Sequence, residues 1–477
     1  MQEPDAFPTL LAAAARGAAQ LEEEGVLSLA LRLPWEPCQP GPDPLQLLPH
    51  LKGADPFRFL WDGAPGLCLA ASGRSHSLDL SGPRRFELAQ RFSSLSLSRL
   101  AMPQACPALA RPRVLLAFAF FDSPLHEGMG VPGLQAVLPR WQLSRQGRQG
   151  WLRLQRPLGG DVTARSLAEE LWEEGTRIRR LCQEGWADNR AREPESALLD
   201  AADLSAQPWR RDYLVAVERA LELVDEEELQ KLVLAVRQPL LLQQPLDPLA
   251  LLDRLRRRQA GSCRFLWQRT TDDVLFGASP ERLLTVRQGQ LRSDALAGTA
   301  LAAGEARGLL QSGKDRHEHE LVVETISRVL GEAGLIARRP RHPRLARHGH
   351  LVHLHTPITA DLGPVHPLAL AERLHPTPAV AGLPRRQAMG WLRSLEPFER
   401  GHYAAPIGWI DSEGDTDLRV AIRSGHLRGR QLDLTAGAGL VRGSNPEREL
   451  EEVGLKLDVL RQQLGAPGSA LAARHRG

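Results

Sequence analysis

The segment 313–320, GKDRHEHE, is dense in charged and imidazole side chains, and an amphipathic pattern follows it. On a helix, the apolar stripe of this pattern consists of Leu321, Val322, Thr325, Ile326 and Val329. Glu318 falls on the same stripe. Because an isolated buried carboxylate is very costly, Glu318 needs a partner, which is either an arginine or a metal ion.

A comparable arrangement occurs in residues 445–460, NPERELEEVGLKLDVL. Glu449, Glu452 and Lys456 are spaced i, i+3, i+7, so they share one helix face. Glu452 and Lys456 can form an ordinary i, i+4 ion pair there. Alternatively, two helices that each offer a carboxylate can hold Mg²⁺, which commonly binds one or two carboxylates, water and an anionic group of a substrate.

Lysine is rare in this chain. Of 60 lysine and arginine residues, the lysines are Lys52, Lys231, Lys314 and Lys456. Arginine does not release its proton at ordinary pH, whereas a buried lysine can. Each lysine is therefore a candidate for amine chemistry.

The histidines give little support for a transition metal. His317 and His319 flank Glu318 and point to different sides of the expected helix, so they cannot chelate one ion. His353 and His355 share a strand face, which leaves a weak metal-binding interpretation. We expect instead that one of this second pair donates to a substrate and that the other is structural.

Composition excludes several classes of protein. The 477 residues carry a net charge of +3, with 42% hydrophobic and 25% charged residues, which is typical of a globular protein and argues against a nucleic-acid binder. The first 25 residues lack a basic signal-peptide region, and no apolar run is long enough to span a membrane. The five cysteines lack CxxC spacing, which favours free thiols in the cytoplasm.

The element pattern mixes strands and helices. We expect strands at 26–32, 57–61, 67–71, 114–121, 231–236, 274–278, 283–287, 291–297 and 350–355, a hairpin of 418–423 with 431–438, and helices at 166–184, 209–223, 248–258, 314–330 and 446–464. Asp247 is placed to cap the third of these helices. Residues 189–208 are polar and loop-like. This order predicts an α+β fold with large, mainly antiparallel sheets.

Six ordered motifs carry a family resemblance. They are GASPERLL (277–284), DALAGTA (294–300), GKDRHEHELV (313–322), HPTPAVAGLP (375–384), AGAGLVRGS (436–444) and GLKL (454–457). Over residues 206–465 the chain resembles the chorismate-utilising enzymes, and among them the isochorismate synthases of menaquinone and phylloquinone synthesis. The resemblance implies the two-sheet β-sandwich of anthranilate synthase component I, with helices packed outside. Residues 1–205 would complete the sandwich, 206–465 would form the catalytic region and 466–477 would be a disordered tail.

The resemblance also implies a reaction and its residues. Water would add at ring C2 of chorismate while the C4 hydroxyl leaves from the other face. Lys231 matches the general base, and its strand of leucine and valine should lower its pKa. Glu281 matches the general acid, which must stay protonated near neutral pH. Glu318 and Glu452 match the magnesium ligands, with Glu449 as an outer partner of the ion.

The resemblance further implies substrate contacts, which are Gly298, Thr299, His353, Arg423, Gly437, Gly439 and Lys456. Arg423, which we expect in a strand, could clamp a carboxylate. The glycines would allow close backbone approach to a ligand. The G-x-G of residues 437–439 is not a phosphate loop, because no helix opens directly after it.

Alternatives and departures remain open at this stage. Relatives that form aminodeoxychorismate carry a nucleophilic lysine where this chain has Ala297, so water remains the nucleophile. Salicylate synthases share much of the pocket and are the main rival. A non-catalytic protein that binds anions through residues 341–350, RHPRLARHGH, is a rival of another class, although we expect a surface loop there. Gly313 stands where the family commonly has an acidic residue, and Val236 stands where it usually has an arginine. We expect a cytoplasmic monomer or weak homodimer.

Overall fold

The computed structural model of the protein describes residues 6–21, 24–33, 41–63, 66–125, 130–184, 207, 209–302 and 306–464. The expected disordered tail at 466–477 and nearly all of the expected loop at 189–208 lie outside these residues. Within them, no helix is both long enough and apolar enough to cross a membrane.

The strands are β1 (Val26–Leu33), β2 (Arg58–Asp62), β3 (Cys68–Leu80), β4 (Leu100–Ala101), β5 (Arg113–Phe118), β6 (Leu134–Gln146), β7 (Gln149–Pro157), β8 (Lys231–Leu241), β9 (Cys263–Thr270), β10 (Asp273–Ser279), β11 (Arg282–Arg287), β12 (Gln290–Leu301), β13 (Arg344–His348), β14 (Leu351–Asp361), β15 (Gly382–Leu383), β16 (Pro406–Asp411), β17 (Thr416–Val420), β18 (Ser424–Arg428) and β19 (Gln431–Leu440).

The α-helices are α1 (Ala6–Ala19), α2 (Pro44–Leu47), α3 (Arg85–Ser98), α4 (Ala164–Gln183), α6 (Trp209–Asp225), α7 (Pro248–Arg258), α8 (Ala306–Gln311), α9 (Gly313–Glu332), α10 (Pro367–Leu374), α11 (Arg385–Leu395) and α12 (Pro446–Arg461). Short 3₁₀ turns are η1 (Leu48–His50), η2 (Ala108–Ala110) and η4 (Gln462–Leu464).

The sheet branches at β6. One edge of β6 pairs with β3, and from there a first arm continues through β2, β9, β10, β18, β19 and β8 to β15. The other edge pairs with β7, which leads to β1 and β4, and with β5. From β5 a second arm continues through β16, β17, β11, β12 and β14 to β13. Every pairing except β1–β4 is antiparallel, so the expected mainly antiparallel α+β fold is confirmed.

Alternate residues of the strands serve two different cores, as the period of two in a β-strand requires. Phe59 and Trp61 of β2 belong to an aromatic cluster with Trp267 of β9 and Trp409 of β16, so this cluster joins the two arms. Leu60, between the two β2 aromatics, belongs to the larger core that also contains the apolar faces of the helices. The arms are therefore packed against each other on one side and covered by helices on the other.

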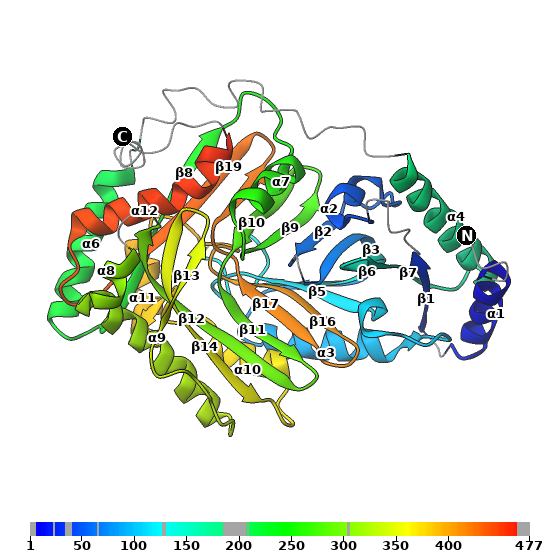
Figure 1. Cartoon of the computed structure of the whole chain (residues 1–477), viewed down its shortest axis with the longest axis horizontal. Coiled ribbons are helices and arrows are strands. Elements are labelled where there is room, and N and C mark those ends of the chain that lie inside the picture. The colour runs from blue at the N-terminus through cyan, green and yellow to red at the C-terminus, as the bar shows by residue number, and fades with distance from the viewer. Residues whose placement is uncertain are drawn as a thin grey trace.

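The helices that concern the site cover different arms. Helix α9 packs on β12 and β14 of the second arm, whereas α6 packs on β8 and α12 on β19 of the first arm. Figure 1 shows these three helices at one end of the molecule, with α1 and α4 beside β1 at the other end. Side chains fix where the two carboxylate-bearing helices start: Ser312 accepts a hydrogen bond from Asp315 N, and Asn445 accepts one from Arg448 N.

Two expectations about local structure are wrong. The strand β19 does not form a hairpin with residues 418–423; its hairpin partner is β18, while β17 pairs with β16 and β11. Residues 341–350 are not a plain loop, because β13 lies within them and pairs with β14. The expected cap is present, since Asp247 accepts a hydrogen bond from Leu249 N at the start of α7.

Candidate active site

A cavity lies among strands β8, β12, β14 and β19 and helices α9 and α12. Its lining contains Val233, Glu281, Leu296, Ala297, Gly298, Thr299, Glu318, His353, Ala379, Val380, Tyr403, Ile422, Arg423, Gly437, Gly439, Glu452 and Lys456. The free volume is about 50 Å³, room for a few water molecules. Ten of the twelve expected site residues line it; Lys231 and Glu449 lie behind the lining through ion pairs described below, and Lys314 joins them.

Glu281 lies in the tight connection between β10 and β11. Its backbone N donates to Ser279 Oγ at 3.2 Å, and its carbonyl oxygen accepts from Val420 N at 3.1 Å, so the backbone is held on both sides. The side chain is buried, and burial raises its pKa to about 7 although Lys231, Arg423 and Lys456 act in the opposite direction. This carboxyl group can therefore carry a proton near neutral pH.

Lys231 is the first residue of β8 and is fully buried. Its Nζ lies 3.0 Å from Glu318 Oε1. Gly439, on the neighbouring strand β19, leaves room for this pair: a Cβ there would overlap Glu318 Oε1 and would stand 3.0 Å from Lys231 Cε. We expected an arginine or a metal ion as the partner of Glu318. The arginine is wrong, because the cations beside this carboxylate are lysines, and the metal ion stays a prediction.

Three carboxylates from two helices gather beside the cavity, and each has a lysine. Lys314 Nζ lies 2.7 Å from Glu449 Oε1 and 3.5 Å from Glu318 Oε2, and Lys456 Nζ lies 2.6 Å from Glu452 Oε1. Burial alone would raise all three carboxyl pKa values.

The three groups respond differently to their neighbours. The ammonium groups of Lys231 and Lys314 outweigh burial and lower the pKa of Glu318. Lys456 and Lys314 likewise lower the pKa of Glu452 to about 2. For Glu449, burial and the negative charge of Glu452 prevail over Lys314 and raise the pKa to about 7. Glu449 therefore holds a proton more readily than Glu318 or Glu452 does.

The donor set fits a hard divalent cation. Carboxylate oxygens are the ligands that Mg²⁺ prefers, and Glu449 Oε2 is buried without a hydrogen-bond partner. As the side chains stand, no group of three or more His, Cys, Asp or Glu in the described ranges is arranged to hold a metal. The ion pairs explain this, because the lysines engage the oxygens that an ion would need.

An irregularity in strand β12, at Gly298 and Thr299, and a histidine of β14 form another part of the lining; the turn expected at Gly298 and Thr299 is wrong. Thr299 Oγ1 donates to Glu452 Oε1 at 2.9 Å, and His353 Nδ1 donates to the carbonyl oxygen of Gly298 at 2.9 Å. Gly298 has a φ of +68°, a conformation that glycine adopts without strain. Burial lowers the pKa of His353 well below its ordinary value, so the ring is neutral. His355 contacts Asp294 at 3.1 Å, away from the lining.

Arg423 reaches the cavity from a bend, not from a strand as we expected. It lies in the connection between β17 and β18 with a φ of +52°, which is uncommon for a residue with a side chain. Within the part of the chain that the structure describes, its buried side chain forms no ion pair, and burial lowers its pKa. A buried guanidinium without a carboxylate partner is suited to an anionic ligand.

Lys456 and Gly437 form part of the same wall. Lys456 Nζ donates to the carbonyl oxygen of Gly437 at 2.7 Å while it also pairs with Glu452. Gly437 faces β8 closely, since a Cβ there would meet the carbonyl oxygen of Leu234 at 2.6 Å. Both glycines of this strand are therefore required by packing.

Sequence reasoning missed Tyr403, which lines the cavity and whose pKa burial raises to about 12. A signal was available, because the chain contains two tyrosines. The other, Tyr213 on α6, is buried, and burial together with Glu449 and Glu452 raises its pKa. Both tyrosines thus stand next to the site.

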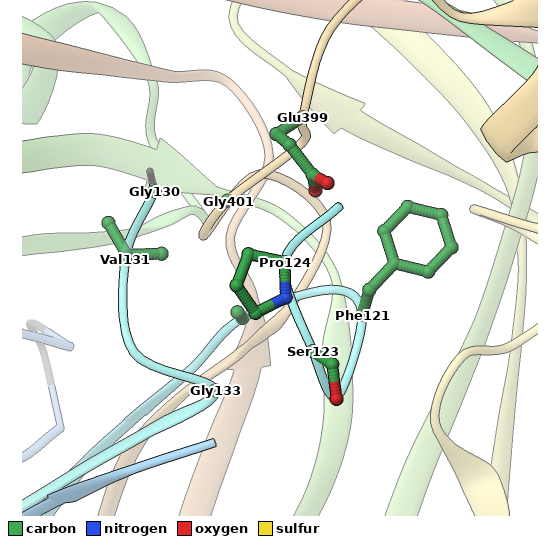
Figure 2. A pocket seen from close by; sticks show the side chains of 9 residues that line it. Phe121, Ser123, Pro124, Gly130, Val131, Gly133, Glu399 and Gly401 are labelled. Atoms are coloured by element: carbon green, nitrogen blue, oxygen red, sulfur yellow. The ribbon is translucent and has the colours of Figure 1, made fainter. Parts of the chain in front are cut away.

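A second hollow lies between the loop that carries Phe121 and Pro124 and the segment of Glu399 and Gly401 (Figure 2). Glu399 Oε1 accepts a hydrogen bond from Leu125 N at 2.6 Å and pairs with Arg393, so this carboxylate is used in holding the loop. The hollow offers no acid–base pair, and the larger group of titratable side chains lies at the first cavity.

Comparison with known protein families gives one match along most of the chain. The family model described as "Chorismate binding enzyme" matches residues 13–465.

Curated relatives match a shorter stretch. The chain is 41% identical over 279 residues to the salicylate biosynthesis isochorismate synthase of Pseudomonas aeruginosa, which covers 56% of this chain and 57% of the relative. It is 36% identical over 278 residues to the isochorismate synthase EntC of Escherichia coli K12, which covers 57% of this chain and 71% of that relative. The match thus spans little more than half the length of the first relative.

Solved structures share the fold along nearly the whole chain. MenF, the menaquinone-specific isochorismate synthase from Escherichia coli, superposes with a TM-score of 0.71 at 24% identity and covers 96% of this chain and 100% of its own. Anthranilate synthase component I from Streptococcus pneumoniae gives a TM-score of 0.65 at 18% identity, covering 88% and 97%. At these identities the likeness bears on the fold alone, and it agrees with the expected architecture.

Proposed function

The chain belongs to the family of chorismate-binding enzymes, and from this membership we propose that it is an isochorismate synthase, which converts chorismate into isochorismate. Water forms a bond to ring C2, the ring double bonds shift and the bond from C4 to its hydroxyl breaks. One proton leaves the attacking water and one joins the departing hydroxyl, so the composition of the substrate does not change.

The observation that carries this proposal is the chemistry around one cavity. A buried carboxyl group with a pKa of about 7, Glu281, shares the cavity with the guanidinium of Arg423, which forms no ion pair among the described residues. The amine of Lys231 lies behind the lining, 3.0 Å from Glu318. A displacement of this kind needs a proton donor, a proton acceptor and a cationic anchor for an acid group, and these residues supply all three types.

Each residue has a proposed role. Lys231, once it has given up its own proton and is a neutral amine, takes the proton from the attacking water, and Glu281 gives a proton to the departing C4 hydroxyl. Arg423 and Lys456 hold carboxylates of the substrate, and the backbone at Gly298 and Gly437 approaches the ligand closely. Because the free volume is small, the long side chains at the cavity have to move when the substrate enters.

We also propose that Mg²⁺ binds between α9 and α12, held by Glu318 and Glu452 with Glu449 as an outer partner. A bound ion would supply positive charge for the ring carboxylate of the substrate. The support from this chain is the convergence of three buried carboxylates and the buried, unpartnered Oε2 of Glu449.

Water is the proposed nucleophile because the position before Gly298 is Ala297, which lines the cavity and carries no amine. The same fold supports a salicylate synthase, which would continue to eliminate pyruvate. Purified protein supplied with chorismate and Mg²⁺ tests both: we expect isochorismate without pyruvate, loss of turnover in EDTA and its recovery with Mg²⁺. Release of pyruvate would assign salicylate formation, and full activity in EDTA would remove the metal.

The pathway and the setting of the enzyme are finer proposals. We propose that the isochorismate serves menaquinone or phylloquinone synthesis, and that the protein acts in the cytoplasm as a monomer or weak homodimer. A strain that lacks the gene should lose its quinone, whereas loss of a salicylate-derived product with normal quinone would redirect the assignment. Sedimentation of the purified protein measures its oligomeric state.

A further inference from the structure

Three of the four lysines in the chain meet at one cluster. Lys231, Lys314 and Lys456 all pair with glutamates there, whereas Lys52 is exposed and lies 3.7 Å from Glu173 on α4. The proposed function uses Lys231 and Lys456. It gives no role to Lys314, although this lysine contacts Glu449, the least exposed of the three glutamates.

Lys314 bridges the two helices that carry the carboxylates. It is the second residue of α9, and its Nζ lies 2.7 Å from Glu449 Oε1 of α12 and 3.5 Å from Glu318 Oε2 of its own helix. An ion bound to carboxylates from both helices has to occupy much the same space. A divalent cation and an ammonium group repel each other at such distances, so the two cannot share these oxygens.

The charges of the cluster support the same conclusion. Three carboxylates face three ammonium groups, so the cluster is balanced without a metal. A divalent ion added to this arrangement would leave two positive charges in excess. The balance is restored most directly if a cation leaves, and Lys314 is the most exposed of the three, with a side chain 24% exposed against 13% for Lys456 and 0% for Lys231.

We propose that Lys314 is a built-in counter-cation that occupies the metal position while no divalent ion is bound and swings out when an ion enters. This inference rests on the metal site of the proposed function. Lysine suits the task, because its ammonium is a compact charge on a flexible stem. Asp315 Oδ1 lies 3.9 Å from the same nitrogen and offers the displaced group another partner near the surface.

The arrangement has a measurable cost in metal affinity. If Lys314 occupies the metal position in some of the molecules, the apparent dissociation constant of the ion equals the intrinsic constant divided by the fraction of molecules whose position is free. Removal of the ammonium should therefore tighten metal binding. If Lys314 instead supported the ion as a neighbour that orients Glu449, its removal would weaken metal binding, so the sign of the change separates the two roles.

The first test is a titration of substrate-free protein with Mn²⁺, followed by the electron paramagnetic resonance of the free ion, with Mg²⁺ as competitor. We expect Lys314→Met to bind Mn²⁺ at least about tenfold more tightly than the unsubstituted protein does. The matched control is Lys52→Met, which removes the exposed lysine and should leave the affinity unchanged. Unchanged or weaker Mn²⁺ binding by Lys314→Met overturns the inference. The proposed metal site still stands in that case, provided that the unsubstituted protein binds the ion.

A second measurement follows the cluster in the unsubstituted protein. With ¹⁵N-labelled lysine, the four Nζ resonances can be followed during the addition of Mg²⁺, and Lys52→Met and Lys314→Met each remove one resonance and so assign it. We expect the resonance of Lys314 to shift or broaden as the ion saturates and that of Lys52 to remain in place. A Lys314 resonance that stays unchanged at saturation overturns the inference, and failure of every variant to bind either ion overturns the metal site together with it.

Discussion

At the scale of single residues, the site depends on a carboxyl group that retains its proton. An ordinary glutamate is ionised at neutral pH, but burial of Glu281 raises its pKa to about 7 in the presence of three nearby cations. The acid is thus available below that pH and is lost above it. The raised pKa also means that ionisation disfavours the folded state, so its contribution to stability is fullest below the ordinary pKa and declines as pH rises to about 7.

This argument predicts the pH dependence of the enzyme. We expect kcat/KM to fall as pH rises through about 7, about tenfold for each further unit, because the proton donor ionises. Glu281→Gln should lower kcat by about 100-fold or more and keep the folded structure. Steady-state kinetics with chorismate between pH 5.5 and 9, with circular dichroism of both proteins, measures this. A variant with near-normal kcat would remove Glu281 from the role of acid.

The sequence predicted the residue types at the site better than their contacts. The spacing in 313–329 placed Glu318 on the buried stripe, and the structure has it there. The spacing could not predict that Lys314 contacts α12, since that contact depends on how two helices far apart in the sequence are packed. The scarcity of lysine was the sequence signal that came closest to predicting this contact, because it marked Lys314 as a candidate for the site.

At the scale of elements, β19 shows how strongly a strand constrains its neighbours. Gly439 lies on this strand opposite Val233 of β8, and a side chain there would enter the space of the pair between Lys231 and Glu318. The strand pairing and the ion pair therefore depend on the same glycine.

We expect Gly439→Ala to reduce kcat by at least about 100-fold, because the added methyl group displaces the amine or the carboxylate that the reaction uses. The control is Gly454→Ala on α12, where a Cβ meets nothing within 4 Å. It should keep full activity and stabilise the protein by up to about 1 kcal/mol, because alanine favours a helix over glycine. Product assays and thermal unfolding measure both. Equal activity of the two variants would contradict the tight packing at Gly439.

The wrong hairpin has a physical explanation at this scale. Hydrophobic patterning predicted a strand over 418–423, but β17 ends at Val420 and the chain bends at Arg423 before β18 begins. The sequence SGHLR of β18 has few apolar residues, so it gave little signal. By contrast, continuous runs of apolar and small residues correctly predicted strands at β8 and β19. The bend itself was invisible because an arginine rarely adopts a positive φ.

At the scale of the whole molecule, the two halves of the sequence are interleaved in one sheet. β2 pairs with β9 and β5 pairs with β16, so neither half closes its own edges. Asp62 of β2 is buried and forms ion pairs with Arg264 of β9 at 3.0 Å and Arg256 of α7 at 2.7 Å. Burial alone would raise the pKa of Asp62, but the two arginines outweigh it and lower the pKa to about 2.

We expect Asp62→Ala to lower the free energy of unfolding by about 3–5 kcal/mol, because the substitution leaves Arg264 buried without its carboxylate. The control is Glu332→Ala, whose pair with Arg328 is exposed on both sides and should contribute at most about 1 kcal/mol. Urea unfolding at neutral pH measures both. Similar small losses would show that the halves are joined by packing alone.

The overall class of the fold followed from strand patterning, whereas the branching at β6 did not. The hairpin of β6 and β7 contains Arg140, Arg145, Arg153 and Arg156 among its apolar residues, which interrupts the alternation that a strand prediction uses. The boundary expected near residue 205 remains a prediction. It does not divide the sheet, because strand pairs such as β2–β9 join residues on both sides of it.

The distribution of lysine has a practical consequence for handling the protein. A reagent that acylates amines meets one well-exposed lysine side chain, Lys52, beside α4, while the other three lysines lie in and behind the cavity. With the α-amine of the chain blocked, coupling through lysine to a solid support would therefore attach the molecules through one side chain, with a common orientation. The same scarcity makes an amine-directed probe that does reach the cavity a selective reporter of its occupancy.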